Sequence, residues 1–212
     1  MALLSLLLVG WLQAPPVGSE QVLVVLTADW EAKEGSATLY EGAERVFGPV
    51  PVHVGATGLG WGDGLFSTTS LPGPRKREGD QRAPAGVFLL GPGWQREEAH
   101  RLYCVDDVDA PEYNRVVRLQ DEERPRWSSA EAMEMYRVAI FVQHNPSQTS
   151  GQGSCIFLHD GGEATLGCSA FQPSIVDRLY RRLRPGARLA QMPRAAYRRY
   201  ALFWGLPAEP DP

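Results

Sequence analysis

The sequence predicts a mainly β fold with a few helices, of the α+β class. Short apolar runs rich in β-branched residues alternate with glycine- and glutamate-rich turns, which is typical of strands. One longer segment repeats its apolar residues with the spacing of a helix. A chain of 212 residues with 43% hydrophobic residues is long enough for one filled core and short for two. We therefore expect a single domain over 20–212, preceded by a leader over 1–19.

The first half of the chain is predicted to form β-hairpins followed by a glycine-rich stretch. The predicted strands cover 21–27, 36–40, 50–54 and 87–90. Glycines alternate over 58–64, but no helix N-terminus follows them, so they do not form a phosphate-binding loop. We interpret them as turn residues and as positions of close backbone approach.

Strands and helices alternate in the second half. Ser128 and Glu131 have the spacing of a capping box and predict a short helix through Met135. Pro173 begins an amphipathic helix that stops at Pro185, and a last helical turn or two follows Pro193. The remaining predicted strands cover 116–119, 138–142, 155–158 and 188–192.

The N-terminal segment predicts export from the cytoplasm. An apolar run over 1–9 is followed by small residues at Val17 and Ser19 that suit a signal peptidase. No Lys or Arg precedes the run, and an uncleaved anchor is the alternative, although the run is short for a membrane span. We expect the mature protein in the periplasm or cell envelope.

Charge argues against nucleic acid as a partner. The formal net charge is −4, and the arginines between 178 and 199 form the only dense basic cluster. The simpler interpretation of this cluster is a solvated helix face. The alternative is contact with an anionic polymer or with the surface of the cell envelope.

Three cysteines leave one without an intramolecular partner in an exported chain. If Cys168 is a reactive thiol, Cys104 and Cys155 either form a disulfide or are both small buried apolar residues. The sequence leaves both alternatives open.

His159 and Cys168 are the most informative pair in the chain. The apolar strand over 155–158 places His159 at a strand end, and the glycine-rich turn that follows returns Cys168 toward its imidazole. An adjacent imidazole can take the proton of a thiol, and the backbone N–H groups around Gly167 can point at an oxyanion. These features predict a cysteine nucleophile with a histidine base, against the alternative of a structural cysteine and a buried histidine.

Other site classes fit this sequence less well. The remaining histidines are scattered and no Cys-x-x-Cys occurs, which argues against zinc, and we predict no metal and no cofactor. Asp106, Asp107 and Asp109 lack the glycine and glutamate of a calcium loop. A papain-like hydrolase is disfavoured because its cysteine precedes its histidine.

The segments 153–159 (GSCIFLH) and 165–168 (TLGC) resemble the active-site motif of the L,D-transpeptidase (YkuD-like) family. Other family elements are resembled by four further segments, namely 76–80, 83–88, Asp106-Asp107 and 113–115. The likeness therefore runs from about Val22 to Pro207. Three departures concern Leu166, where many members carry histidine, Ala170, where many are polar, and Ala164, where the family has proline. The short interval between His159 and Cys168 resembles one subfamily.

This resemblance implies an L,D-transpeptidase-like β-sandwich or barrel with an active-site cleft. Cys168 would attack a peptidoglycan stem peptide to form a thioester with loss of a D-amino acid, His159 would be the general base, and the backbone at Asp160 would orient its ring. Gly167 would contribute its backbone to the oxyanion hole, and a carbapenem would acylate the thiol.

The sequence determines less about which residues bind the substrate carboxylates and about which acceptor takes the acyl group. The candidate substrate-binding residues are Lys76, Arg77, Tyr113, Asn114 and Arg115. An amine acceptor gives a cross-link, and water gives carboxypeptidase or amidase activity. A catalytically silent peptidoglycan-binding module is the non-enzyme alternative, and the oligomeric state is not predicted.

Overall fold

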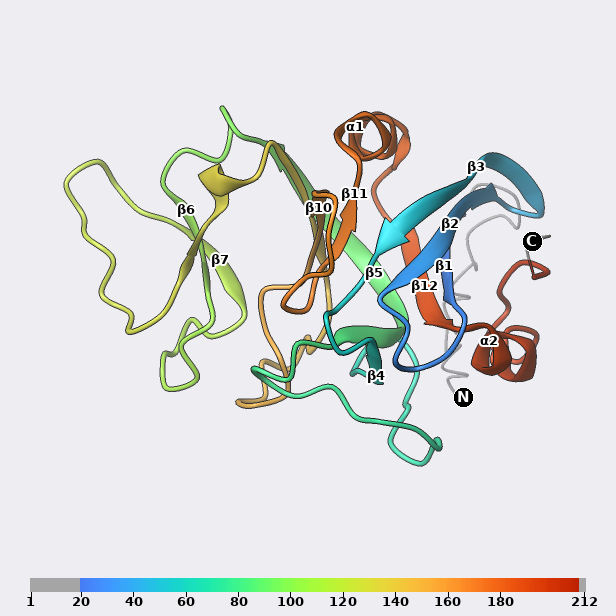
Figure 1. Ribbon diagram of the computed structural model, residues 1–212. Helices are drawn as coiled ribbons and strands as arrows, with labels where there is room; N and C mark the ends of the chain where they lie inside the picture. Colours follow the sequence, from blue (N-terminus) through green and yellow to red (C-terminus); the bar gives the residue numbers. More distant parts are fainter. Residues whose placement is uncertain (1–19, 210–212) are drawn as a thin grey trace, which may run out of the picture.

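A computed structural model describes residues 20–209, so the predicted leader over 1–19 lies outside the described residues (Figure 1). Within this range nine strands form one sheet in the order β12-β1-β2-β3-β11-β10-β9-β5-β4. β12 pairs with β1 at one edge and also with β5, which closes the sheet into a barrel with β4 outside the ring. The strands are β1 Gln21–Thr27, β2 Glu34–Glu41, β3 Glu44–His53, β4 Leu59–Trp61, β5 Ala83–Gln95, β9 Val138–Val142, β10 Phe157–Asp160, β11 Ser169–Phe171 and β12 Arg188–Pro193.

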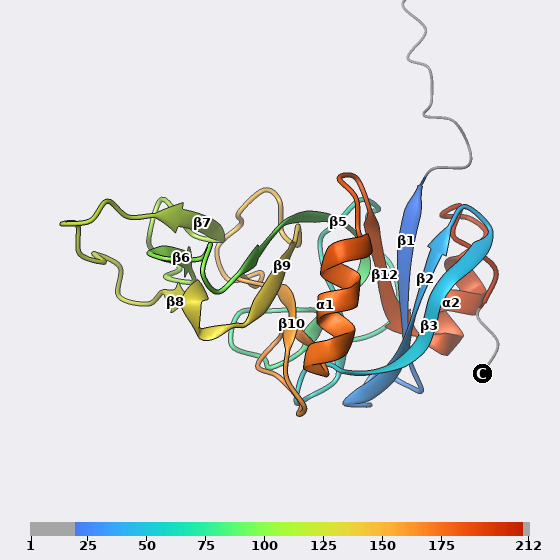
Figure 2. The same cartoon turned by 90° about the horizontal axis from the view of Figure 1, so that it is seen from above.

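Two α-helices lie on the outside of the barrel within residues 20–209. α1 (Pro173–Arg182) packs on β9 and β10 through its buried apolar stripe, and α2 (Arg194–Tyr200) packs on β12 and β1 (Figure 2). Every residue of β1 is buried, because the strand has the core on one face and α2 near the other. No helix in the described range is long and apolar enough to cross a membrane.

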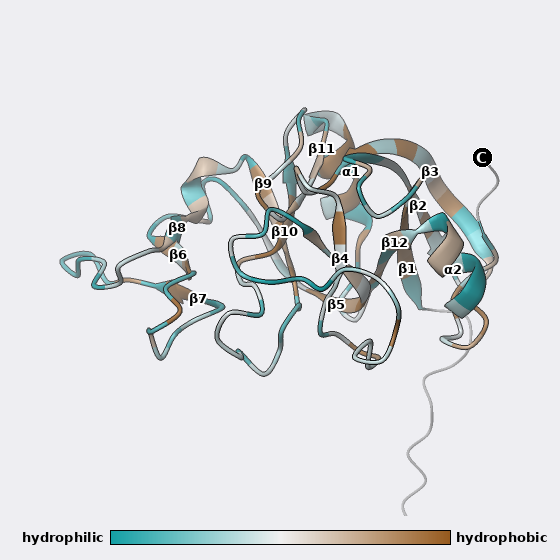
Figure 3. Ribbon diagram, turned by 60° about the horizontal axis from the view of Figure 1, so that its bottom comes forward, coloured by the Kyte–Doolittle hydropathy of each residue, from teal (hydrophilic) through white to brown (hydrophobic). Residues whose placement is uncertain are grey.

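A smaller lobe projects from one side of the barrel (Figures 1 and 2). It contains a three-stranded sheet in the order β7-β6-β8, with β6 Leu102–Val105, β7 Arg115–Arg118 and β8 Glu131–Ala132, followed by the 3-10 helix Met133–Met135. A disulfide between Cys104 and Cys155 joins β6 to the segment that enters β10. The connection from β7 to β8 is charged and is largely hydrophilic in Figure 3.

The predicted fold class is confirmed: the described chain is mainly β with two short α-helices. The capping box predicted at Ser128 and Glu131 is wrong, and of the short helix predicted through Met135 only the 3-10 helix Met133–Met135 forms. The Ser128 N–H donates to the Asp107 carboxylate 2.8 Å away, and Glu131 enters β8, so pairing with β6 replaces the capping box. Four strands were not predicted, namely β4, β6, β8 and β11, because each is too short for its alternation to be recognised.

Candidate active site

Strand register places Cys168 and His159 on one face of the barrel. β10 and β11 are parallel, with Leu158 opposite Ser169 and His159 opposite Ala170. Side chains alternate between the two faces of a sheet, so Ala170, its neighbour His159 and Cys168 two residues before Ala170 point the same way. The glycine-rich loop over 161–167 therefore brings Cys168 to the same face as His159, and both side chains line one cavity. Among residues 20–209, the hydrogen-bond partners of the Cys168 sulfur are the Phe157 N–H and the Cys155 carbonyl.

The thiol of Cys168 lies at the bottom of a cleft and is neutral in the resting protein. The Phe157 N–H donates to its Sγ at 3.3 Å, and its own S–H points to the carbonyl of Cys155 at 3.5 Å. Burial, helped by the nearby negative charge of Glu131, raises the pKa of the Cys168 thiol to about 12. Formation of the thiolate therefore requires a base that takes the S–H proton. It also requires that further negative charge be kept away from the sulfur.

His159 is held in one tautomer by the main chain. Its Nδ1 lies 2.9 Å from the carbonyl oxygen of Asp160, which can only accept, so Nδ1 carries the proton and Nε2 keeps its lone pair. Burial lowers the pKa of His159, which favours the neutral ring. The ring of Tyr136 packs against it with centroids 4.4 Å apart.

The Asp160 side chain has a separate, structural role. Its Oδ1 accepts the N–H groups of Arg137 and Val138 at 2.7 and 3.0 Å, and so ties the end of β10 to the start of β9. The backbone carbonyl of Asp160 and its carboxylate thus fix the histidine and its strand at the same time.

Thr165 organises the loop that presents the nucleophile. Its hydroxyl donates to the Cys168 carbonyl at 2.6 Å and accepts the Gly167 N–H at 3.1 Å. Its backbone is bonded to Val54 and Ala56 on the barrel. Because the Gly167 N–H is already engaged, the predicted donation to an oxyanion requires that it exchange Thr165 for the substrate.

A cavity of about 800 Å³ opens over the thiol, and we call it the Cys168 cavity. Lys76 forms one wall with a side chain only 3% exposed, its Nζ 2.7 Å from Asp80 Oδ1. Several carboxylates also line it. Glu78 accepts from Ser154 and Tyr113, Glu131 accepts from Tyr136, and Asp106 Oδ1 is buried without a hydrogen-bond partner among residues 20–209.

The other predicted substrate-binding residues lie elsewhere. Tyr113 is buried behind Glu78, and Asn114 has a left-handed backbone with φ of 58°. The Asn114 amide joins the carbonyls of His144 and Asn145 to the N–H of Cys155. Arg115 bonds to Gln148 on the surface, and Arg77 lines a neighbouring cavity. Of the predicted set, Lys76, His159, Gly167 and Cys168 meet in the Cys168 cavity.

Sequence reasoning missed the wall opposite the thiol. Glu131 and Tyr136 come from the lobe, and their contact with the site depends on how that lobe is attached to the barrel. Asp106 was considered only as part of an acidic loop. No spacing in the sequence marks these residues, because they lie some 30 to 60 positions before Cys168 and come beside it only in the folded chain.

Several solved structures resemble this chain in fold at low sequence identity. An L,D-transpeptidase from Mycobacterium smegmatis is 13% identical with a TM-score of 0.39, and the match covers 82% of this chain and 59% of that chain. The helical cell shape determining protein Pgp2 from Campylobacter jejuni is 15% identical with a TM-score of 0.43, over 84% of this chain and 51% of that chain. Bd1075 from Bdellovibrio bacteriovorus is 14% identical with a TM-score of 0.42, and the match covers 89% of this chain and 55% of that chain.

The present chain thus spans between about half and three fifths of the length of these structures. No family model matches the sequence, and no curated protein matches it.

Proposed function

We propose that this protein is an exported cysteine acyltransferase that acts on peptidoglycan stem peptides with the activity of an L,D-transpeptidase. The observation that carries the proposal is a single cavity lined by a cysteine thiol and a histidine whose Nδ1 lies 2.9 Å from a main-chain carbonyl, which leaves Nε2 as the base. The choice of substrate rests on the motif resemblance at 153–159 and 165–168.

In the acylation step, His159 Nε2 takes the S–H proton while Cys168 Sγ forms a bond to the carbonyl carbon of the stem peptide. The resulting oxyanion collapses, the C–N bond to the D-amino acid breaks, and the imidazolium returns the proton to the leaving amine. An acceptor amine then gives its proton to His159 and attacks the thioester carbonyl. Its new amide bond releases the thiol, so atoms and protons balance over the cycle.

Burial couples proton transfer to substrate attack. The pKa of Cys168 is raised and the pKa of His159 is lowered, so both groups are neutral before substrate arrives. A neutral pair gives no persistent thiolate, and this protects the thiol from oxidation and from unwanted electrophiles. The negative charge therefore develops on sulfur only as it moves onto the substrate oxygen.

Lys76 is the residue we assign to a carboxylate of the stem peptide. Its ammonium has three N–H donors, and two are accounted for by Asp80 Oδ1 at 2.7 Å and the Arg77 carbonyl at 2.6 Å. Its Nζ lies 3.9 Å from the position that a Cβ on Gly167 would occupy, so the third donor is close to the nucleophile loop.

The test is intact mass spectrometry of the protein from Ser19 onward, incubated with a stem tetrapeptide donor. We expect a mass gain equal to the donor minus its terminal D-amino acid, absent in Cys168→Ala. A carbapenem should label the same residue. A wild-type protein that gains no mass from either reagent, or an adduct that persists in Cys168→Ala, overturns the proposal.

Product analysis then separates transfer from hydrolysis. With a primary amine acceptor in excess, a transpeptidase forms the new amide, whereas shortened peptide as the sole product identifies a carboxypeptidase on the same thioester route. Unchanged peptide together with binding identifies a silent module.

A further inference from the structure

The turn that follows α2 presents two adjacent apolar side chains to solvent. Leu202 is 94% exposed and Phe203 is 86% exposed, the two highest values among the large hydrophobic residues of 20–209. In Figure 3 the hydrophobic colour of this turn follows directly on the hydrophilic colour of α2. Neither side chain lines the Cys168 cavity. An apolar surface of this kind, away from the reacting groups, indicates a contact with an apolar environment.

The exposed pair is held outward by an ordered backbone. The Ala201 N–H donates to the Tyr197 carbonyl at 2.8 Å, and the Leu206 N–H donates to the Ala201 carbonyl at 2.9 Å. Between these bonds, the side chain of Trp204 is buried. Burying the exposed pair in the core would therefore require that backbone hydrogen bonds break or that the indole of Trp204 be expelled.

An aromatic cluster lies beneath the turn. The ring of Trp204 stacks on Tyr200 with centroids 5.3 Å apart and on Phe66 with centroids 5.4 Å apart. Trp61 meets the ring of Trp204 edge-on at 6.1 Å. The turn is thus packed against β4 and against the loop that follows it, and its outward side chains project from this packed base.

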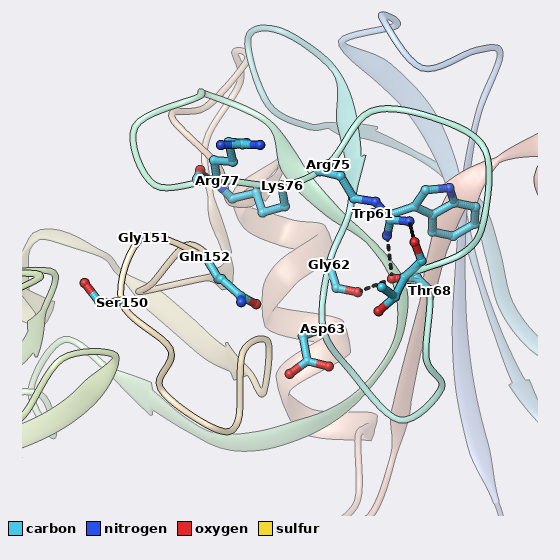
Figure 4. A pocket seen from close by; sticks show the side chains of 11 residues that line it. Trp61, Gly62, Asp63, Thr68, Arg75, Lys76, Arg77, Ser150, Gly151 and Gln152 are labelled. Atoms are coloured by element: carbon cyan, nitrogen blue, oxygen red, sulfur yellow. Dashed lines mark hydrogen bonds between the residues drawn. The ribbon is translucent and has the colours of Figure 1, made fainter.

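The loop that supplies Phe66 is itself fixed. The Arg75 guanidinium donates to Thr68 Oγ1 at 3.2 Å (Figure 4). The indole N–H of Trp61 donates to the Pro72 carbonyl at 2.8 Å. The base under the turn is therefore ordered before any partner binds, which lowers the entropic cost of a contact there.

Arginines border the exposed pair. Arg198 and Arg199 occupy the last turn of α2, and both are exposed. The charged residues of 194–209 are three arginines and one glutamate, and this Glu209 pairs with Arg194 and Arg198. The guanidinium of Arg199 makes no hydrogen bond or ion pair within residues 20–209, and it lies 5.7 Å from the ring centroid of Tyr200. The turn therefore combines a net positive charge with its apolar pair.

This combination suits the surface of an anionic lipid bilayer. Apolar side chains enter the boundary between headgroups and acyl chains, while arginines stay at the phosphates. Tyr and Trp rings favour the same interface. A protein partner suits the turn less well, because a phenyl ring buries only about 150–250 Å², whereas a stable protein–protein interface buries about 1,200 Å² or more.

We propose that the turn after α2 docks the protein on an anionic phospholipid bilayer. Leu202 and Phe203 insert below the headgroups, and the exposed arginines at the end of α2 contact the lipid phosphates. The contact is reversible, since two side chains bury far less apolar surface than a membrane-spanning helix. It does not depend on the chemistry at Cys168, because neither the pair nor these arginines line the Cys168 cavity.

The experiment is sedimentation of the protein from Ser19 onward with two kinds of vesicle. One kind is phosphatidylcholine alone, and the other is phosphatidylcholine mixed with phosphatidylglycerol. Starting at Ser19 removes the apolar run over 1–9, which could itself bind lipid. The tested variants are the double variant Leu202→Ser with Phe203→Ser, and the single variant Arg199→Gln.

Matched controls remove similar groups elsewhere. Val108→Ser changes an exposed apolar residue of the lobe, and Arg181→Gln changes an exposed arginine of α1. Phe203→Trp keeps an aromatic ring at the turn and should bind at least as well as wild type. Thermal unfolding of each variant verifies that it is folded, and the tested side chains are exposed, so their replacement should not unfold the protein.

We expect wild-type protein to sediment with the anionic vesicles and much less with the neutral ones. The double variant should lower the partition coefficient about tenfold or more, through loss of the inserted apolar surface. Arg199→Gln should lower it about fivefold, on anionic vesicles only. Val108→Ser and Arg181→Gln should bind as wild type does.

Three outcomes overturn the inference. The first is wild-type protein that stays in the supernatant with both kinds of vesicle. The second is anionic binding that is lost in Arg199→Gln but unchanged in the double variant, which identifies adsorption by charge without insertion. The third is a dimer, seen by analytical ultracentrifugation without lipid, that disappears in the double variant, because a second copy of the chain then occupies the turn.

Discussion

The two sides of the Cys168 cavity are built by different means. On the barrel side, the register of β10 and β11 places Cys168, just before β11, and His159 on one face. On the lobe side, Glu131 lies on β8 of the small sheet and Tyr136 follows the 3-10 helix just before β9. The lobe is further joined to the segment before β10 by a disulfide and by the Asn114 amide. Backbone pairing thus places the reacting groups, while side-chain and covalent links place the groups that set the charge around them.

The largest effect is expected on the barrel side, from His159→Gln. Loss of the base should lower the rate of Cys168 acylation about 10²- to 10⁴-fold. Stability should change little, since the variant keeps an amide near the Asp160 carbonyl. The rate is measured by quenched intact mass spectrometry, with His53→Gln as the matched control, because His53 lies on β3 outside the cavity. A variant that acylates at the wild-type rate would show that His159 is not the base.

The lobe side is challenged by removing its covalent link. The double variant Cys104→Ala and Cys155→Ala removes a cross-link between two residues that are 51 positions apart in sequence. The greater conformational entropy of the unfolded chain alone predicts a loss of about 4 kcal/mol in the free energy of unfolding. Urea denaturation measures it. Wild-type protein in reductant should lose a similar amount, and an unchanged midpoint in both would mean that the lobe is held by its polar contacts.

The buried His144 predicts a dependence of stability on pH. Burial lowers the pKa of His144 to about 4, against about 6.5 in the unfolded chain. Between these values the unfolded chain binds more protons, so the stabilisation is fully present above pH of about 6.5 and is lost as the pH falls toward 4. The expected loss is about 3 kcal/mol.

Denaturation at a series of pH values measures this loss, and His144→Gln should flatten the curve over the same interval. His159, whose pKa is also lowered, contributes with the same sign. A steep fall that persists unchanged in His144→Gln would assign it to other groups.

The smallest effect concerns the charge that the lobe brings to the barrel side. Glu131 helps to raise the pKa of Cys168, so Glu131→Gln should increase the rate of thiol alkylation by iodoacetamide at mildly alkaline pH. The increase should be about three- to tenfold, as expected for loss of one charge near a buried thiol. Glu122→Gln, at an exposed position of the same lobe, is the control. A rate that falls or stays constant would mean that Glu131 does not act on the thiol.

Much of the barrel was predictable because its strands carry strong local signals. β1 and β9 are recognisable as apolar runs rich in β-branched residues, and Pro173 marks the start of α1. The path that brings Cys168 back toward His159 was also visible, since a glycine-rich turn joins the two. The roles assigned to them, and to Gly167 and Asp160, stay predictions.

The lobe and the neighbouring cavity were not predictable on the same basis. The capping-box spacing at Ser128 and Glu131 was overridden by pairing with β6 and by the Asp107 carboxylate. Lys76 and Arg77 are adjacent in sequence, yet one lines the Cys168 cavity and the other does not. Adjacent residues can point to different spaces, and local patterns carry no information about which.

The sequence by itself determined the fold class, most of the strands, and a histidine and cysteine close enough in the chain to meet. Only the tertiary structure decided which charges surround them, which cysteines are joined, and that His144 is buried between the backbone carbonyls of Asp63 and Gln152. The physical reason is range. Hydrophobic periodicity and turn chemistry act over a few residues, whereas burial, pKa shifts and cavities depend on segments that are distant in sequence and come together only in the folded protein.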